Sequence, residues 1–129
     1  MNKKTLNYIF HHMGIPTTKI QPNERYSSVF KMHTSESGNS EFRIQYHRFE
    51  PGCPLHPLLQ SMPHIAFKVP SIDEAIKDHH VILEPYFPFA GFRVTVIEFD
   101  GAPIELIETN LTEEQIWTAP QEKSYIYPD

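Results

Sequence analysis

The stretch PHIAFKVPSIDEAI (residues 63–76) decides the fold that we expect for this chain. Its first part, HIAFKV (64–69), has the apolar and β-branched content of a strand. Ser71 and Glu74, three positions apart, then form the capping box of a helix. We therefore predict a strand followed by a helix over 71–80 whose apolar stripe covers one face of the strand.

The residues after this helix predict a hairpin and a short final helix. GFRVTVIEF (91–99) and APIELIET (102–109) read as strands, and Asp100-Gly101 between them is a dipeptide favoured in tight hairpins. A second capping box begins at Thr112 and predicts a helix around 113–117. A strand, a helix and further strands in this order are typical of an α+β fold with a mainly antiparallel sheet.

The first half of the chain echoes this pattern with less helix. We predict strands over 6–15, 26–34 and 41–49, with a loop over 35–40. The segment 50–63 holds four prolines and reads as a linker. No helical period follows the first strand, so the first half is expected to be a truncated version of the second.

The composition of the chain limits the classes of function and partner that we expect. The chain has 129 residues, 40% of them hydrophobic, which suits a single compact domain. The net charge is -5 without a dense basic cluster, which disfavours nucleic acid or an anionic membrane as a partner. A single cysteine, Cys53, and the lack of a long apolar segment favour a cytoplasmic protein.

Polar residues recur at matching places in the two halves. Side chains alternate between the two faces of a strand, and one polar side chain per strand lies on the face opposite the predicted core. His12 and His64 are 52 positions apart, and Gln45 and Glu105 are 60 positions apart. Two imidazoles, a carboxylate and an amide oxygen suit a divalent transition metal. These residues are His12, Gln45, His64 and Glu105.

The sequence resembles the vicinal-oxygen-chelate superfamily, which includes glyoxalases, bleomycin-resistance proteins, extradiol dioxygenases and methylmalonyl-CoA epimerases. The resemblance lies in HHMGIP (11–16), in 64–76 and in GFRVTVIEFDGAPIELIE (91–108). It implies paired βαβββ modules that form a cupped, mainly antiparallel sheet around a metal. The modules would span about 5–50 and 63–109 of one domain over residues 1–129, with the linker 50–63 between them and a tail over 110–129.

The resemblance also implies a ligand set and a reaction class. The ligands would be His12, Gln45, His64 and Glu105, a set similar to that of the methylmalonyl-CoA epimerases, around Co, Ni, Mn, Zn or Fe. We expect a metal-dependent isomerase, epimerase or lyase that acts on a small carbonyl or thioester through an enolate, with Glu105 moving the proton. The alternative is a binding protein of the bleomycin-resistance type that sequesters a small molecule without turnover. A scaffold without a ligand is a third possibility.

Several further side chains have open roles. His47 shares the predicted face of Gln45 and is a reserve ligand or a proton shuttle, and His11 would replace His12 after a one-residue slip of the strand. Arg43 and Lys68 would bind a substrate carboxylate or phosphate, or stay solvated. The second acid or base of an epimerase has no motif here, although Glu24, Glu41 and Glu98 are candidates. The exposed sheet edges and the aromatic tail predict a homodimer.

Overall fold

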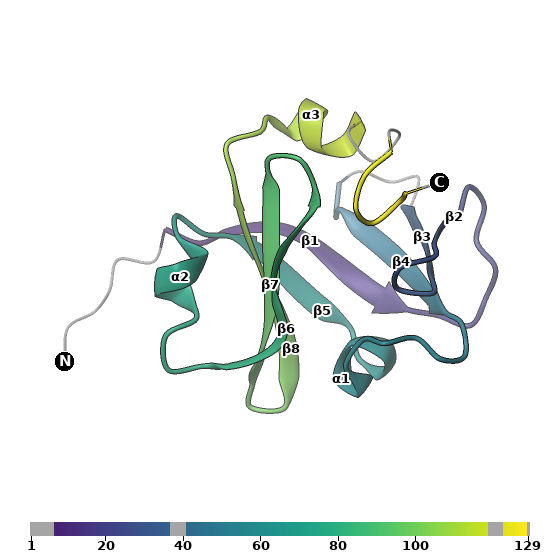
Figure 1. Cartoon of the computed structure of the whole chain (residues 1–129), viewed down its shortest axis with the longest axis horizontal. Coiled ribbons are helices and arrows are strands. Elements are labelled where there is room, and N and C mark those ends of the chain that lie inside the picture. The colour runs from purple at the N-terminus through teal and green to yellow at the C-terminus, as the bar shows by residue number, and fades with distance from the viewer. Residues whose placement is uncertain (1–6, 37–40, 119–122, 129) are drawn as a thin grey trace.

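A computed structural model describes residues 7–36, 41–118 and 123–128, which form one curled sheet with three short helices (Figure 1). The strand order is β2-β3-β4-β1-β5-β8-β7-β6. This confirms the predicted α+β class with a cupped sheet. The strands are β1 (Ile9–Pro16), β2 (Arg25–Ser27), β3 (Met32–Glu36), β4 (Ile44–Phe49), β5 (His64–Lys68), β6 (His80–Phe89), β7 (Phe92–Phe99) and β8 (Ala102–Thr109), and the helices are α1 (Pro57–Ser61), α2 (Ile72–Ala75) and α3 (Glu113–Thr118).

The two halves of the sheet repeat one path. Strands β1 and β5 lie at the centre and pair antiparallel with each other, whereas each pairs parallel with the last strand of its own half, β4 or β8. Gly14 faces Gln45 in the first parallel pair, and Ala66 faces Glu105 in the second. The spacings of 52 and 60 residues seen in the sequence thus correspond to equivalent positions in the two registers.

The second half begins as its sequence predicts and then departs from it. Helix α2 packs Ile72 against Val69, Ile97 and Leu106 on one face of the sheet, and Ser71 caps its first turn. The expected extent of this helix, 71–80, is wrong, because it ends at Ala75 and the chain turns into the long strand β6. Strand β6 is an edge strand, where prolines are tolerated.

The first half differs from its prediction in two places. The single strand expected over 26–34 is two strands, β2 and β3, and Lys31 in the turn between them has a φ of 51°. The expected linker over 50–63 contains helix α1, which starts with Pro57 at a position where its missing N–H costs nothing. The His56 side chain caps this helix by accepting a hydrogen bond from Leu58 N at 3.1 Å.

No helix forms over residues 17–24, where the first half would carry its counterpart of α2. A polar network covers this part of the sheet instead, on the face opposite His47. Arg48 donates two hydrogen bonds to the Glu24 carboxylate, at 2.9 and 2.7 Å, and also lies 3.4 Å from Glu50. His33 is 2.9 Å from the same Glu50 oxygen. The network therefore joins β3 and β4 to the loop before β2.

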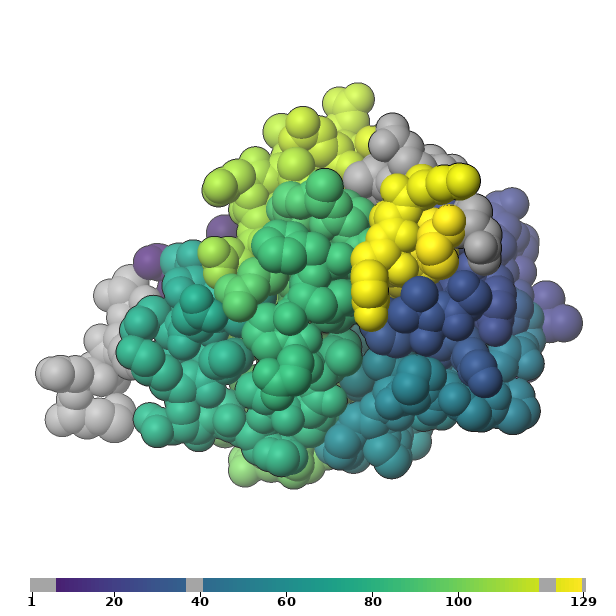
Figure 2. Space-filling view, viewed as in Figure 1, coloured from purple at the N-terminus to yellow at the C-terminus, as the bar shows by residue number. Residues whose placement is uncertain are grey.

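Helix α3 lies against the other face of the sheet, away from α2 (Figure 1). Its Ile116 packs on Ala66, Phe92 and Val94. Figure 2 shows the C-terminal segment, in yellow, on the surface between the strands of the two halves. Its Ile126 N–H donates a hydrogen bond to Pro88 O at 3.1 Å. Within the described part of the chain, none of the helices is long and apolar enough to cross a membrane.

Replacing Arg48 with methionine is expected to destabilise the fold in a pH-dependent way. The hydrogen bonds from Arg48 lower the pKa of Glu24 from 4.5 to about 2. Because the folded-state pKa is the lower one, this stabilisation is complete above pH 4.5 and is lost as the pH falls towards 2. Urea midpoints of Arg48→Met and wild type should therefore differ clearly at pH 7 and converge near pH 2.5.

The matched control is Arg93→Met, which breaks ion pairs with Asp73 and Glu108, whose side chains are 74% and 41% exposed. Exposed pairs contribute little to stability. A midpoint shift for Arg48→Met no larger than that for Arg93→Met, or one that does not change with pH, would contradict the role of the network.

Candidate metal centre

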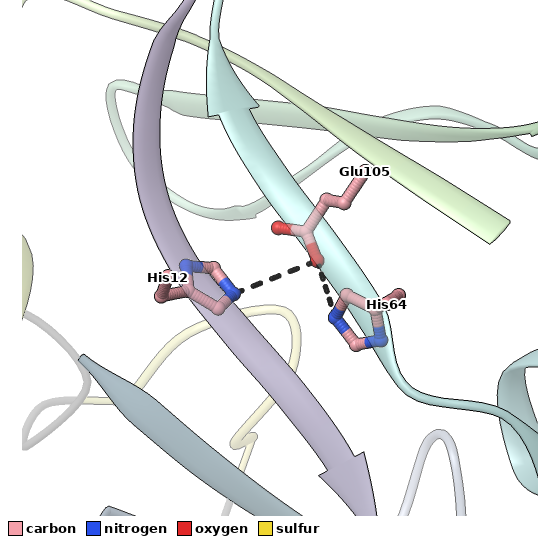
Figure 3. Close-up of side chains that lie close together, drawn as sticks. All are labelled: His12, His64 and Glu105. Carbon is pink, nitrogen blue, oxygen red and sulfur yellow. Dashed lines mark ion pairs between the residues drawn. The ribbon is translucent and has the colours of Figure 1, made fainter. Parts of the chain in front are cut away.

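Three side chains from three adjacent strands converge on the side of the sheet that faces α3. One ligand atom of each of His12 (β1), His64 (β5) and Glu105 (β8) lies within 4.8 Å of the others. Glu105 Oε1 is 3.1 Å from His64 Nε2 and 3.7 Å from His12 Nε2. Figure 3 shows the carboxylate turned towards both rings. The sequence prediction that these three residues come together is confirmed by this geometry.

Small residues on the central strands make room for the two imidazoles. In the antiparallel register, Gly14 lies opposite His64, and Ala66 lies opposite His12. A Cβ atom on residue 14 would overlap the ring carbon Cε1 of His64. Gly14 is therefore required for close approach of the backbone to a ring, while its φ is not in the left-handed region.

The unpaired atoms of the cluster fit a divalent ion. Neither ring nitrogen of the buried His64 has a hydrogen bond of acceptable geometry, although Nε2 is close to Glu105. Buried polar atoms are normally satisfied, so an unpaired imidazole nitrogen beside a carboxylate indicates a missing partner. Two imidazoles and one carboxylate with open positions are a common ligand set for zinc and other transition metals.

Burial sets the protonation state of the cluster. Burial lowers the pKa of His12 to about 4, despite the opposing effect of Glu105. Burial by itself would raise the pKa of Glu105, but the neighbouring imidazoles of His12 and His64 hold it at about 2. At neutral pH the His12 ring is neutral and Glu105 is ionised, which are the forms that bind metals.

A cavity of about 420 Å³ opens in front of the cluster. Helices α1 and α3, strand β6 and the C-terminal segment all contribute to its walls. The size is that of a site for a small molecule. Its apolar wall includes Phe30, Met32, Phe49, Leu59, Phe89 and Phe92.

The two other predicted polar residues of β4 also line this cavity. Gln45 lies across from Gly14, and its side chain hydrogen-bonds the Glu36 carboxylate. His47 stacks on His64 with ring centroids 5.7 Å apart, and its Nδ1 is 3.0 Å from Thr34 Oγ1. Their roles as a fourth ligand and as a reserve ligand or proton shuttle remain predictions.

The predicted substrate-binding cations lie elsewhere. Arg43 and Lys68 do not line the cavity, and each has a side-chain nitrogen 4.0 Å from the Glu113 carboxylate on α3. The Arg43 guanidinium also covers the Trp117 ring, 4.7 Å from its centroid. Both side chains are partly exposed, so a part in binding substrate remains a prediction.

Sequence reasoning missed Glu36 and considered His11 only as a replacement for His12. Glu36 is, with Glu105, one of two carboxylates among the described residues that line the cavity. The residue is exposed at the end of β3, and partial burial of its carboxyl raises its pKa. His11 is buried beside His12, because a bulge in β1 between Phe10 and His12 breaks the alternation of faces. The His11-His12 pair is visible in the sequence, but the bulge that buries His11 beside His12 has no sequence signature.

Solved structures with the same fold include an epimerase. A hypothetical protein from Bacillus halodurans C-125, BH1468, matches with a TM-score of 0.63 and 20% identity over 82% of this chain and 97% of its own. Methylmalonyl-CoA epimerase from Mycobacterium tuberculosis matches with a TM-score of 0.57 and 14% identity over 86% and 93%. This likeness shows that the chain shares its fold with both proteins. No protein-family model matches the sequence, and no curated protein is significantly similar to it.

We expect the protein to bind about one divalent transition metal ion per chain through this cluster. His64→Ala and Glu105→Ala should each abolish binding, because two remaining ligands hold such an ion poorly. Elemental analysis of tag-free protein after dialysis against Zn²⁺ measures the content. Glu84→Ala, which removes an exposed carboxylate on β6, should bind like the wild type. Unchanged metal content in both cluster variants would remove the site.

Gly14→Ala should weaken metal binding without changing a ligand. The added methyl group would displace the His64 ring from its place over the strand. We expect the Zn²⁺ affinity to fall by at least about tenfold, as for other changes that disorient a ligand. Gly101→Ala is the control, because it strains a turn at φ 82° far from any side chain and should lower stability alone. Equal affinities of the two variants would contradict the role of Gly14.

Proposed function

We propose that the protein is a metal-dependent enzyme of the vicinal-oxygen-chelate type that moves a proton at the carbon next to a carbonyl group. An isomerase or epimerase reaction, or a lyase reaction, on a small carbonyl or thioester compound belongs to this class. The convergence of His12, His64 and Glu105 at the base of a cavity carries the proposal. The shared fold with methylmalonyl-CoA epimerase supports it, without identifying the substrate.

The ligand set defines what the ion would contribute. A divalent ion held by His12, His64 and Glu105, with Gln45 as a fourth ligand in the proposed set, would stabilise negative charge on a substrate carbonyl oxygen as a Lewis acid. The apolar part of the cavity wall would limit the access of water to the carbon that loses its proton.

Proton transfer is assigned to a carboxylate of the cavity. Glu105 was the predicted acceptor, but its low pKa makes it a weak base and suits it to hold the ion. Glu36 lies on the cavity wall beside Gln45 and has a raised pKa, which suits a general base. His47 is buried, and burial lowers its pKa to about 3, so it is neutral at pH 7 and would serve as a hydrogen-bonding group.

Metal-loaded protein in D₂O is expected to exchange the proton next to the carbonyl of its substrate. A panel of 2-substituted carbonyl acids and acyl thioesters, followed by proton NMR, would measure the exchange. Glu36→Gln should lower the rate by about 100-fold or more, the scale of a lost general base. It should leave the Zn²⁺ content unchanged. Glu84→Gln on the outside of β6 is the matched control and should exchange like the wild type.

A binding protein without turnover is the second candidate, favoured by the aromatic and aliphatic lining of the cavity. It would retain a compound of the panel tightly with or without metal, and no deuterium would enter that compound. This result would reject the enzymatic proposal. Exchange that requires both the ion and Glu36 would reject the binding protein.

A further inference from the structure

His11 is a buried histidine beside the candidate metal ligands that the proposed mechanism leaves unused. Its Nδ1 lies 2.8 Å from Nδ1 of His12, and its ring stacks on Trp117 with centroids 5.4 Å apart and planes 4° from parallel. Its Nε2 lies 3.2 Å from Glu113 Oε1. His11 thus connects His12 to helix α3, on the side of the His12 ring away from Glu105.

The contact between the two Nδ1 atoms has two possible proton arrangements. If His11 donates, His12 carries its own proton on Nε2, and that nitrogen has no lone pair for a metal. If His12 donates from Nδ1, its Nε2 has a lone pair that faces Glu105. The position of one proton therefore decides whether His12 is a competent ligand.

Glu113 selects between these arrangements. Its carboxylate accepts a hydrogen bond from Trp117 Nε1 at 3.1 Å, and the side-chain nitrogens of Arg43 and Lys68 lie 4.0 Å away. A carboxylate accepts hydrogen bonds and cannot donate them. The contact between Glu113 Oε1 and His11 Nε2 is close but does not have the geometry of a hydrogen bond. Among the described residues, this buried nitrogen has no other hydrogen-bond partner that would compete with the carboxylate. The carboxylate therefore favours the proton on His11 Nε2 and the lone pair on Nδ1.

We propose that His11, held by Glu113 and Trp117 of α3, is a positioning residue that keeps His12 in the tautomer whose Nε2 lone pair points to the ligand cluster. The chain runs from the Glu113 carboxylate through both rings to the ligand nitrogen. The effect of this chain on metal affinity rests on the metal site proposed above. Hydrogen-bond partners of metal-bound histidines fix the tautomer and the ring orientation in this way.

The tautomer is measured first on the metal-free protein. Histidine labelled with ¹⁵N and long-range proton–nitrogen correlation at pH 7 distinguish protonated from unprotonated ring nitrogens, and a His12→Phe variant assigns the signals. We expect His12 to carry its proton on Nδ1 and His11 on Nε2. A His12 ring protonated on Nε2 would overturn the proposal. This determination of the tautomers by NMR does not depend on whether the protein binds metal.

Metal affinity is the second measurement. Glu113→Met removes the oxygen that faces both His11 Nε2 and Trp117 Nε1, so we expect the His12 proton to shift towards Nε2 and the Zn²⁺ affinity to fall by about 10–100-fold. The matched control is Glu114→Met, the same change at the exposed neighbour on α3, which should have the wild-type tautomer and affinity. Equal affinities of the two variants, or a weakened Glu113→Met that keeps the wild-type tautomer, would overturn the proposal.

A further variant separates the relay from simple packing. His11→Phe keeps a ring on Trp117 but removes both nitrogens. Its affinity for Zn²⁺ should fall as far as that of Glu113→Met, and the double variant should be no weaker than either, because both changes break one chain. Additive losses would overturn the proposal. A wild type that binds no Zn²⁺ would reject the metal function, whereas the NMR result on that protein still decides the tautomer.

Discussion

The antiparallel pairing of β1 with β5 is the constraint on which the rest of the structure depends. It joins the two halves of the sheet, and its register decides which side chains face each other. Gly14 opposite His64 and Ala66 opposite His12 allow each imidazole to lie over a small residue of the other strand. The parallel neighbours then add further polar side chains, Gln45 and His47 from β4 and Glu105 from β8. A slip of one residue would turn a strand's side chains to the other face and disperse the cluster.

The two halves solve the same packing problem in different ways. In the second half, α2 covers the outer face of the sheet with Ile72 at its centre. The first half lacks this helix over 17–24, and its outer face is covered by the network around Arg48. A network of ion pairs keeps its groups satisfied only while all its partners are present. The outer face of the first half therefore depends on polar geometry, whereas that of the second depends on apolar burial.

The parts of the fold predicted from the sequence are those in which local pattern and tertiary contacts agree. Strands β5, β7 and β8 have clear apolar content, and the matched spacing of the polar residues predicts His12, His64 and Glu105 on one face, where the structure has them. The apolar period after Ser71 predicted a helix of ten residues, over 71–80. Helix α2 has only four residues, because the chain turns after Ala75 and then pairs with β7 as strand β6.

The parts that could not be predicted depend on contacts distant in sequence. Strand β6 contains Pro85 and Pro88, which mask a strand in a pattern search, and it forms because its partner β7 is in place. The bulge that buries His11 beside His12 arises from the pairing of β1 with β5. Glu36 reaches the cavity through its place opposite Gln45 in β4. None of these relations is encoded in a short motif.

The electrostatics of the cluster distinguish a ligand set from an ordinary buried ion pair. In a stable His–Glu pair, the carboxylate keeps the imidazole charged, and the pKa of the histidine rises. Here the pKa of His12 stays low despite Glu105, because burial and the neighbouring imidazoles outweigh one carboxylate. At neutral pH the Glu105 carboxylate therefore faces a neutral His12 ring. A divalent ion at this point would add positive charge beside Glu105 and would use the His12 lone pair, so an arrangement that is costly as a salt bridge would be favourable in the proposed metal site.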